Sequence, residues 1–368
     1  MRQLTTSLQI AAITLLLLIS SCKKPSKEEK KDEGPGTLLY QDVYCGVTDE
    51  LFWLNNENIL IGEPCSGTLK KVNVSTKSVE LIRFSTDNSP MRSFYSQQLP
   101  NTLFYVAFKQ GTSGSFPTQF SLYARNLTTG STATVMDSLP GIASPLIFFA
   151  LGNKKLAYTG YQLKETFIID LERSTLQKIP LPGHIVQAFS PDDKQMLMHA
   201  VTRVQTNDPL TITGSFIYDF ACQCLQPLTP NPLINTYYYS LYNRGNVFWR
   251  PQGIYAYTVM DRYQYNIKFL NLTTNTELTS FLKLQGGPWV SANSTLAAVW
   301  VPNSNSNPNA SATATLVLYD LVTQQKKELF TANCCNAAFV SDVTDVIVSP
   351  DGKKVAFAKG GALRMIAL

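Results

Sequence analysis

Histidine is almost absent from this sequence, which has only two among 368 residues, His184 and His199. No Gly-x-Ser-x-Gly elbow accompanies either one, so the nucleophile and base of a hydrolase triad have no signature here. We expect His199, in the apolar run Met196-Leu197-Met198-His199, to be a buried strand residue, and His184 to lie in a connection. Active-site carboxylates around a central channel can come from distant parts of the sequence and need no motif. A hydrolase or lyase with such a site therefore stays an alternative.

Concentrated positive charge is also lacking. Charged residues make up 15% of the chain, and the net charge of +5 is spread along it. Surfaces that bind nucleic acid combine clustered basic residues with a recognisable binding fold, and no basic cluster with interleaved aromatics is present. We therefore expect no nucleic-acid partner.

A hydrophobic run that spans a bilayer comfortably is missing as well. The apolar stretch from Leu8 to Ile19 follows Arg2 and is too short for this. It ends in Leu18-Ile19-Ser20-Ser21-Cys22, which resembles the lipobox of bacterial lipoprotein signal peptides. The resemblance implies that residues 1–21 are a signal peptide and that Cys22 is lipidated, which anchors the protein by acyl chains. A secretory signal or a membrane anchor with an incidental cysteine is the alternative.

The segment after the lipobox cysteine, residues 22–36, has the composition of a solvated tether. It is rich in Lys, Glu and Asp, includes Pro25 and Pro35, and cannot bury a core. Lys23, rather than Asp, follows the cysteine, which resembles lipoproteins sorted to the outer membrane. Some lipoproteins of the Bacteroidetes type carry a charged surface-export signal just after the cysteine, but here the segment has mixed rather than cleanly acidic charge. The periplasmic and the cell-surface side both stay open.

Two short phrases recur along the rest of the chain. The first is a turn that leads into an apolar strand, repeated about every 49 residues, which is in the range of four-stranded propeller blades. The best copies contain Ser-Pro-Asp-Gly or a close variant. In chain order the copies are Trp53-Leu54-Asn55-Asn56, Leu99-Pro100-Asn101-Thr102, Ala150-Leu151-Gly152-Asn153, Ser190-Pro191-Asp192-Asp193, Arg250-Pro251-Gln252-Gly253, Ser291-Ala292-Asn293-Ser294 and Ser349-Pro350-Asp351-Gly352.

The second phrase is an apolar strand that ends in Asp or Asn and runs into a turn resembling Leu-x-Thr. These side chains can bond to the backbone of the turn, so their recurrence needs no functional explanation. The copies are Asn73-Val74-Ser75-Thr76, Asn126-Leu127-Thr128-Thr129, Asp170-Leu171, Asp219-Phe220, Asn271-Leu272-Thr273-Thr274, Asp320-Leu321-Val322-Thr323 and the truncated Met365-Ile366-Ala367-Leu368.

Both counts predict an all-β protein, a β-propeller of seven four-stranded blades. Six blades would follow if the two weakest turn copies were loops. No linker interrupts the repeat, so residues 37–368 are expected to form a single domain. The chain stops in the third strand of the last blade, which leaves an unpaired edge. We expect Leu38 to Tyr44 to pair with Ala362 to Leu368, so that strands from the two ends of the chain close the ring.

The cysteines suit an oxidising compartment, because an even number remains once Cys22 is set aside. In the propeller frame Cys45 and Cys65 fall on one face and are expected to form a disulfide. Cys222 and Cys224 flank a turn on the opposite face. This pair, and the pair Cys334 and Cys335, can each close a small loop. We expect no metal site, because the two close pairs lie on opposite faces. The six disulfide candidates are Cys45, Cys65, Cys222, Cys224, Cys334 and Cys335.

Aromatic residues concentrate around the fifth blade and the loop that enters it. Three consecutive tyrosines cannot all point inward from one strand, so at least one ring should be exposed. An exposed tyrosine favours recognition of a protein or glycan, because it offers apolar area with a polar group. The alternative is a loop that merely folds over the blade. The candidate binding residues are Tyr237, Tyr238, Tyr239 and Tyr242.

The turn phrases Phe189-Ser190-Pro191-Asp192, Trp249-Arg250-Pro251-Gln252-Gly253 and Val348-Ser349-Pro350-Asp351-Gly352 resemble the WD-like repeats of TolB-type propellers. That family includes envelope scaffolds that bind proteins, and domains attached to peptidases, of which none is present here. The resemblance implies the propeller fold and, together with the lipobox and the tyrosines, favours a non-enzymatic lipoprotein of the outer membrane that binds an envelope protein or glycan, without a cofactor. The alternative is a propeller hydrolase or lyase that acts on a carbohydrate or lactone in the central channel. Fold analogy names no ligand.

Overall fold

The structure of the chain is a computed structural model. It describes residues 35–41, 51–63, 68–84, 88–96, 98–109, 120–142, 148–160, 162–202, 210–228, 237–238, 254–261, 264–272, 274, 276–284, 290–293, 296–303, 313–320, 323, 325–333, 343–359 and 361–368. The elements assigned within these ranges are all β-strands. None of the described segments forms an apolar helix of membrane-spanning length.

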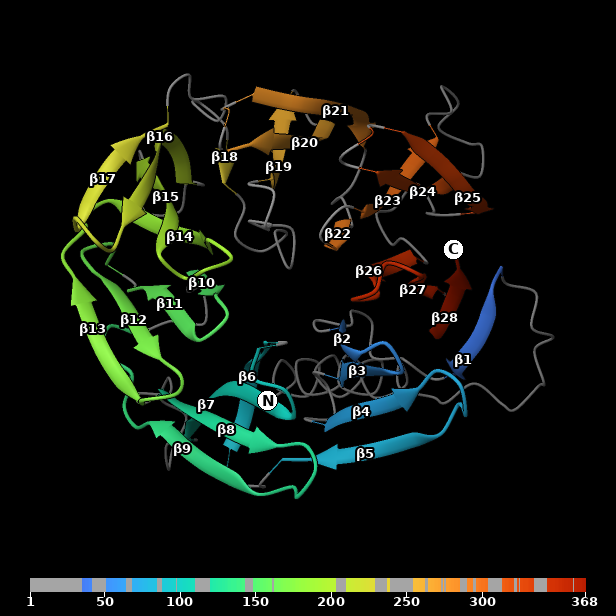
Figure 1. Cartoon of the computed structure of the whole chain (residues 1–368), viewed down its shortest axis with the longest axis horizontal. Coiled ribbons are helices and arrows are strands. Elements are labelled where there is room, and N and C mark those ends of the chain that lie inside the picture. Colours follow the sequence, from blue (N-terminus) through green and yellow to red (C-terminus); the bar gives the residue numbers. More distant parts are fainter. Residues whose placement is uncertain are drawn as a thin grey trace, which may run out of the picture. The chain divides into compact units, whose positions relative to one another are not determined.

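The described strands pair into seven antiparallel sheets, in which neighbouring strands are consecutive in the chain except where the first strand joins the last sheet and where a short strand is added to the fourth (Figure 1). The first three are β2 (Leu51–Asn55), β3 (Asn58–Glu63), β4 (Thr68–Asn73) and β5 (Val79–Arg83); β6 (Asn88–Tyr95), β7 (Thr102–Lys109), β8 (Phe120–Asn126) and β9 (Thr132–Met136); and β10 (Phe148–Leu151), β11 (Lys155–Thr159), β12 (Thr166–Asp170) and β13 (Thr175–Ile179).

The fourth sheet contains β14 (His184–Phe189), β15 (Gln195–Thr202), β16 (Leu210–Asp219) and β17 (Cys224–Pro227), with β18 (Tyr237–Tyr238) paired to β16. The fifth contains β19 (Ile254–Asp261), β20 (Gln264–Asn271) and β21 (Thr276–Leu284). The last two are β22 (Val290–Asn293), β23 (Leu296–Asn303), β24 (Thr313–Asp320) and β25 (Lys326–Asn333); and β26 (Val343–Val348), β27 (Lys354–Lys359) and β28 (Ala362–Ala367), which β1 (Thr37–Gln41) completes.

Strands from the two ends of the chain share one sheet. β1 pairs antiparallel with β28, with Thr37 opposite Met365 and Gln41 opposite Ala362 (Figure 1). β1 thus supplies the fourth strand of a sheet whose other three strands come from the end of the chain. This confirms the predicted pairing of the two chain ends in part, for Thr37 to Gln41 with Ala362 to Met365. Asp42 to Tyr44, which we also expected to pair, lie outside the described residues.

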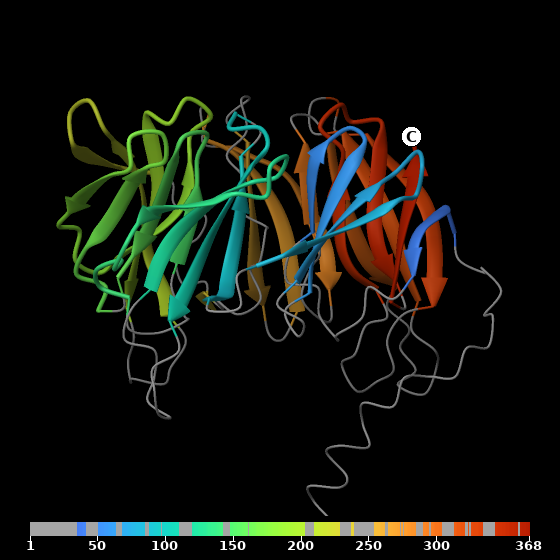
Figure 2. The same ribbon diagram turned by 90° about the horizontal axis from the view of Figure 1, so that it is seen from below.

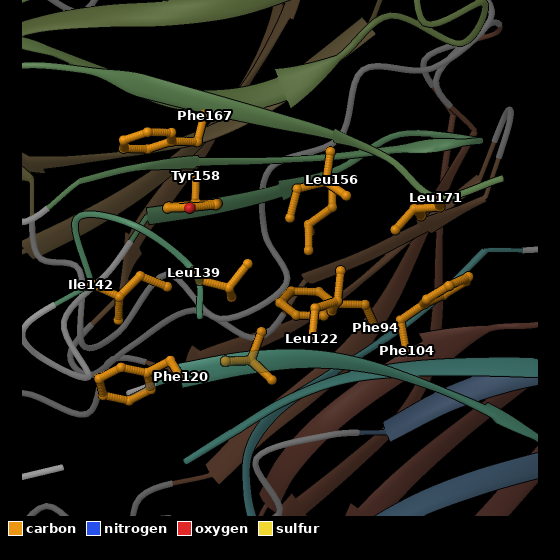
Figure 3. Close-up of a cluster of buried hydrophobic side chains, with 12 residues drawn as sticks. Phe94, Phe104, Phe120, Leu122, Leu139, Ile142, Leu156, Tyr158, Phe167 and Leu171 are labelled. Carbon is orange, nitrogen blue, oxygen red and sulfur yellow. The ribbon is translucent and has the colours of Figure 1, made fainter. Parts of the chain in front are cut away.

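Apolar side chains fill the space between five pairs of successive sheets in the described part of the chain. Figure 3 shows one such cluster, in which Phe94, Phe104 and Leu122 of the β6–β9 sheet face Leu156 and Tyr158 of the β10–β13 sheet. Tyr158 is fully buried, and its hydroxyl donates a hydrogen bond of 3.0 Å to the backbone oxygen of Pro140. Burying a large apolar side chain contributes roughly 1.5–3 kcal/mol, so this cluster is a strong joint between the two sheets.

The same kind of cluster joins the sheet completed by β1 to the β2–β5 sheet. Leu39 and Leu363 pack with Trp53 and Ile59, all of them buried. The indole Nε1 of Trp53 donates a hydrogen bond of 3.3 Å to the backbone oxygen of Ile347 in β26. Residues almost 300 positions apart in the sequence are therefore packed in one core.

Candidate functional site

The two repeated phrases form turns at the same end of the sheets. In a meander of antiparallel strands, the turn between strands one and two lies on the same side as the turn between strands three and four. Figure 2 shows this side at the top, where the C-terminus also lies. We call it the turn face.

The Ser-Pro-Asp turns owe their shape to a fixed set of side-chain bonds. Ser190 Oγ donates to Asp192 Oδ1 over 2.7 Å, and the amide of Gln195 donates back to Ser190 Oγ over 2.9 Å. Ser349, Asp351 and Lys354 repeat both bonds with the same lengths. The serine and aspartate of these two turns are therefore explained by local turn chemistry.

The Asp or Asn of the second phrase caps its turn in the same way. Asn73 Oδ1 accepts amide hydrogens from Ser75 at 3.0 Å and Thr76 at 2.9 Å. Asp170 Oδ1 accepts the amides of Glu172 and Arg173 at 3.0 and 2.9 Å. This confirms that the recurrence of these residues is structural.

Lysines link the turns of neighbouring sheets. Lys155 Nζ, at the start of β11, donates to the backbone oxygen of Asp193 in the β14–β15 turn over 2.9 Å. Lys354 Nζ, at the start of β27, donates to the backbone oxygen of Asn56 in the β2–β3 turn over 2.7 Å. Each lysine begins the second strand of its sheet, and each acceptor lies two residues before the second strand of the next sheet.

A groove of about 660 Å³ crosses the turn face over three successive sheets. It is lined by Gln98 before β7, by both turns of the β10–β13 sheet and by both turns of the β14–β17 sheet. The lining residues from these four turns are Asn153, Lys154, Lys155, Asp170, Glu172, Arg173, Asp192, Asp193, Lys194, Gln195, Asp219, Phe220 and Ala221.

The floor of the groove is held by the carboxylate of Asp193. This residue stands where the other turn has Gly352, and both have a positive φ, 57° for Asp193 and 71° for the glycine. Its Oδ1 accepts the amide of Asn153 at 2.8 Å, and its Oδ2 accepts the amide of Lys154 at 2.7 Å. Burial raises the pKa of Asp193, although these two amides oppose the rise. The carboxylate therefore clamps two sheets together.

The rim of the groove carries exposed charges of both signs. Lys154 Nζ lies 3.0 Å from Glu172 Oε1, and Lys194 Nζ lies 3.6 Å from Asp192 Oδ2. Arg173, next to Glu172, is also exposed. Exposed ion pairs contribute little to stability, so these groups can exchange partners with a charged ligand at small cost. The rim suits a hydrophilic partner that presents both acceptors and donors.

Both histidines lie in the β14–β17 sheet. His199 is buried in β15, its Nδ1 is 2.9 Å from Ser215 Oγ, and burial lowers its pKa to about 3. It is therefore neutral near pH 7, in agreement with the prediction of a buried strand residue. His184 begins β14, where it pairs with Ala200, so the expectation that it lies in a connection was wrong. The strand begins directly after Pro182-Gly183.

Only part of the sequence-predicted site falls within the described residues. Tyr237 and Tyr238 form β18, which pairs with Thr211 and Leu210 at the start of β16. This strand therefore extends the fourth sheet, at the end of β16 opposite to Asp219 and the turn face. The other candidates Tyr239, Tyr242, Cys22, Cys45, Cys65, Cys334 and Cys335 lie outside the described residues.

A disulfide joins Cys222 to Cys224 in the turn between β16 and β17. It lies directly after Ala221, the last lining residue of the groove. Within the part of the chain that the structure describes, no cluster of three or more His, Cys, Asp or Glu side chains could hold a metal ion.

The sequence reasoning missed the groove. Its residues belong to the two repeated phrases, which were interpreted as turn chemistry alone. One signal was available, because Asp193 replaces the glycine of the best turn copy at a position of positive φ. A residue that accepts this strained conformation was a candidate for a specific contact.

No protein-family model matches the chain, and no curated protein matches it. Solved structures do resemble it. An uncharacterized protein from Listeria monocytogenes EGD-e aligns with a TM-score of 0.55 and 14% identity, over 88% of this chain and 95% of that one. The β-propeller domain of Cps50 from Myceliophteria thermophila aligns with a TM-score of 0.55 and 10% identity, over 91% of this chain and all of that one (100%).

TolB from Acinetobacter baumannii also aligns, with a TM-score of 0.45 and 14% identity, and this chain spans 62% of its length. At such identities a likeness concerns the fold alone. The two alignments with TM-scores above 0.5, together with the sheets of the described residues, show that the chain has an all-β propeller fold.

Proposed function

We propose that this protein is a non-enzymatic binding or scaffold module whose groove on the turn face contacts an envelope protein or glycan. The observation that carries the proposal is the open groove with exposed charges of both signs, Lys154, Arg173 and Lys194 beside Glu172 and Asp192. A rigid fold positions these groups on short turns, as binding surfaces generally require.

The proposed module is a closed ring of seven blades. The lysine link from Lys155 to Asp193, within the chain, recurs between Lys354 and Asn56, which lie at opposite ends of it. A repeated contact of this kind is expected when the last sheet packs on the first as any sheet packs on the next. β1 then completes the last blade and leaves the ring without a gap at the chain ends.

Catalysis in the groove has less support than binding. Both carboxylate oxygens of Asp193 accept backbone amides, so this buried acid is committed to holding the turns. His199 is fully buried and neutral. The proposal therefore favours a binding module over the hydrolase or lyase that the sequence left open.

The proposed location is the outer membrane, with the protein anchored by lipid at Cys22 and residues 23–36 as the tether. This part of the proposal is supported by the lipobox alone. The side of the membrane is left open between periplasm and cell surface. Mass spectrometry of the N-terminal peptide of the mature protein tests it, with an acylated Cys22 as the expected result. An unmodified peptide that begins elsewhere would contradict the anchor.

In-cell crosslinking, followed by purification from solubilised envelopes, tests the binding role. The groove variant is Lys154→Glu combined with Lys194→Glu, and its matched control is Lys353→Glu, an exposed lysine in the turn of another sheet. A second variant changes Tyr237, Tyr238 and Tyr239 to Ser. We expect a stoichiometric partner that the groove variant loses and the control keeps. Loss in the tyrosine variant alone would move the contact to β18, and no partner at all would contradict the scaffold.

A further inference from the structure

Four described turns between the third and fourth strands of their sheets share one geometry, in which the fifth residue has a positive φ. This residue is Lys77 with φ 58°, Gly130 with 73°, Ser174 with 52° and Gln223 with 53°. The backbone amides of Lys77 and Gly130 each donate to the first residue of their turn over 2.9 Å. These turns can therefore be compared position by position.

In three turns formed by the second phrase, hydroxyl groups bridge the fourth and the sixth positions. Thr76 Oγ1 lies 2.9 Å from Ser78 Oγ, and Thr129 Oγ1 lies 2.8 Å from Ser131 Oγ. In the turn after β20, Thr274 Oγ1 lies 2.7 Å from Thr276 Oγ1. Each pair is a single hydrogen bond on the surface of the molecule.

Cys222 and Cys224 occupy these same two positions in the turn after β16. A disulfide therefore stands where other sheets have a hydrogen bond between hydroxyls. The turn also has bonds that do not involve the sulfur atoms, since Asp219 Oδ1 accepts the amide of Ala221 at 2.8 Å. Gln195 Nε2 also donates to Asp219 Oδ2 over 2.9 Å and ties the turn to β15.

The disulfide also constrains the unfolded chain very little. Only Gln223 lies between the two cysteines, and the stabilisation from a crosslink falls as the closed loop shortens. Cys222 and Gln223 are exposed, and Cys224 is half-buried. The bond is thus accessible to thiols in solution, and its reduction should cost the fold little.

We propose that Cys222–Cys224 is a reversible dithiol–disulfide site that exchanges with an external dithiol while the protein stays folded. A thiolate of the donor attacks Cys222 Sγ, the more exposed residue, and forms a mixed disulfide. The electron pair of the broken bond leaves on Cys224 Sγ, which takes up a proton. The second thiolate of the donor then attacks the donor sulfur that is bonded to Cys222 in the mixed disulfide. This releases Cys222, which is protonated, and leaves the donor oxidised.

Thiol labelling of the folded full-length protein tests the proposal. The probe is dithiothreitol at increasing concentration, followed by iodoacetamide and mass spectrometry of the Cys222–Cys224 peptide. We expect both cysteines to become labelled while the far-UV circular dichroism is unchanged and the Tm falls by no more than about 3 °C. Labelling that occurs only together with loss of the folded signal would overturn the proposal.

Two variants separate exchange from a structural role. Cys222→Thr with Cys224→Ser restores the hydroxyl pair of Thr76 and Ser78, and it should fold with a Tm within about 3 °C of the wild type. Cys224→Ser alone should form a mixed disulfide at Cys222 when oxidised glutathione is added. A double variant that does not fold, or a Cys222 thiol that does not react in the folded single variant, would contradict the site.

Discussion

Two junctions between sheets can be compared residue by residue: the one between the β10–β13 and β14–β17 sheets, and the one between the sheet completed by β1 and the β2–β5 sheet. Both have a lysine at the start of a second strand that donates to the next turn, Lys155 to Asp193 and Lys354 to Asn56. The side chains of the acceptor residues differ. Asp193 is a buried carboxylate that accepts two amides, whereas Asn56 Oδ1 accepts one, from Asp351 at 3.0 Å.

This difference shows which features belong to the fold and which to the site. The lysine link recurs and therefore serves the packing of one sheet on the next. The carboxylate of Asp193 occurs at only one of the two junctions, the one beneath the groove. A repeat architecture thus provides equivalent positions, and a single substitution at one of them creates a specialised surface.

The largest expected effect on stability comes from removing β1, which completes the sheet that packs on the β2–β5 sheet. A chain that begins at Asp49 lacks β1, which leaves β28 unpaired and exposes the core around Leu363. We expect loss of the cooperative thermal transition, measured by circular dichroism. A cooperative melt of the shortened chain would contradict closure by β1.

A smaller effect is expected from each lysine link. Lys155→Met and Lys354→Met should each lower the free energy of unfolding by about 1–2 kcal/mol, because a hydrogen bond between turns is lost. The neighbouring exposed lysines provide controls, and Lys154→Met and Lys353→Met should change it by less than about 0.5 kcal/mol. Urea denaturation measures all four. A cost at Lys155 without one at Lys354 would mean that the junctions are not equivalent.

The carboxylate of Asp193 should make the stability of the junction between the β10–β13 and β14–β17 sheets depend on pH. Because burial raises the pKa of Asp193 in the folded state, the folded protein binds this proton more tightly than the unfolded chain does. Its contribution to stability is therefore complete below the usual pKa of an aspartate and is lost as the pH rises through the raised pKa. Asp193→Asn, which cannot titrate, should cost more stability near pH 4 than at pH 7. Thermal melts of both proteins at the two pH values measure the difference, and an equal cost would contradict the shift.

The smallest effect is expected at the rim of the groove. Glu172→Gln breaks the exposed ion pair with Lys154 and should change the free energy of unfolding by less than about 0.5 kcal/mol. Partner capture, by contrast, should weaken if the rim is the contact surface. A stability loss well above this limit would show that the rim is structural.

The sequence predicted the propeller because each repeat contains the residues that form its own turns. Ser190, Ser349 and the capping residues Asn73 and Asp170 have local roles, and local chemistry can be recognised from one sequence. The pairing of β1 was predictable for a different reason, since an unfinished blade at the C-terminus needs a strand from elsewhere.

The groove was not predictable in the same way. Asp193 contacts Asn153 and Lys154, which lie about 40 residues earlier on another sheet, and nothing in either segment alone indicates the contact. The equivalence of Cys222 and Cys224 with hydroxyl pairs lies between these cases. Aligning the second phrase by its capping residue places Cys222 with Thr76 and Cys224 with Ser78, so the sequence contained this relation although it was not used.

Hydrogen exchange of the intact protein tests most directly whether the two junctions are equivalent. The account predicts that amides of β1 and β28 are protected to the same degree as those of β11 and β12 and exchange only with global unfolding. Exchange of β1 and β28 through a separate opening, much faster than that of β11 and β12, would contradict a ring that is closed at the ends of the chain.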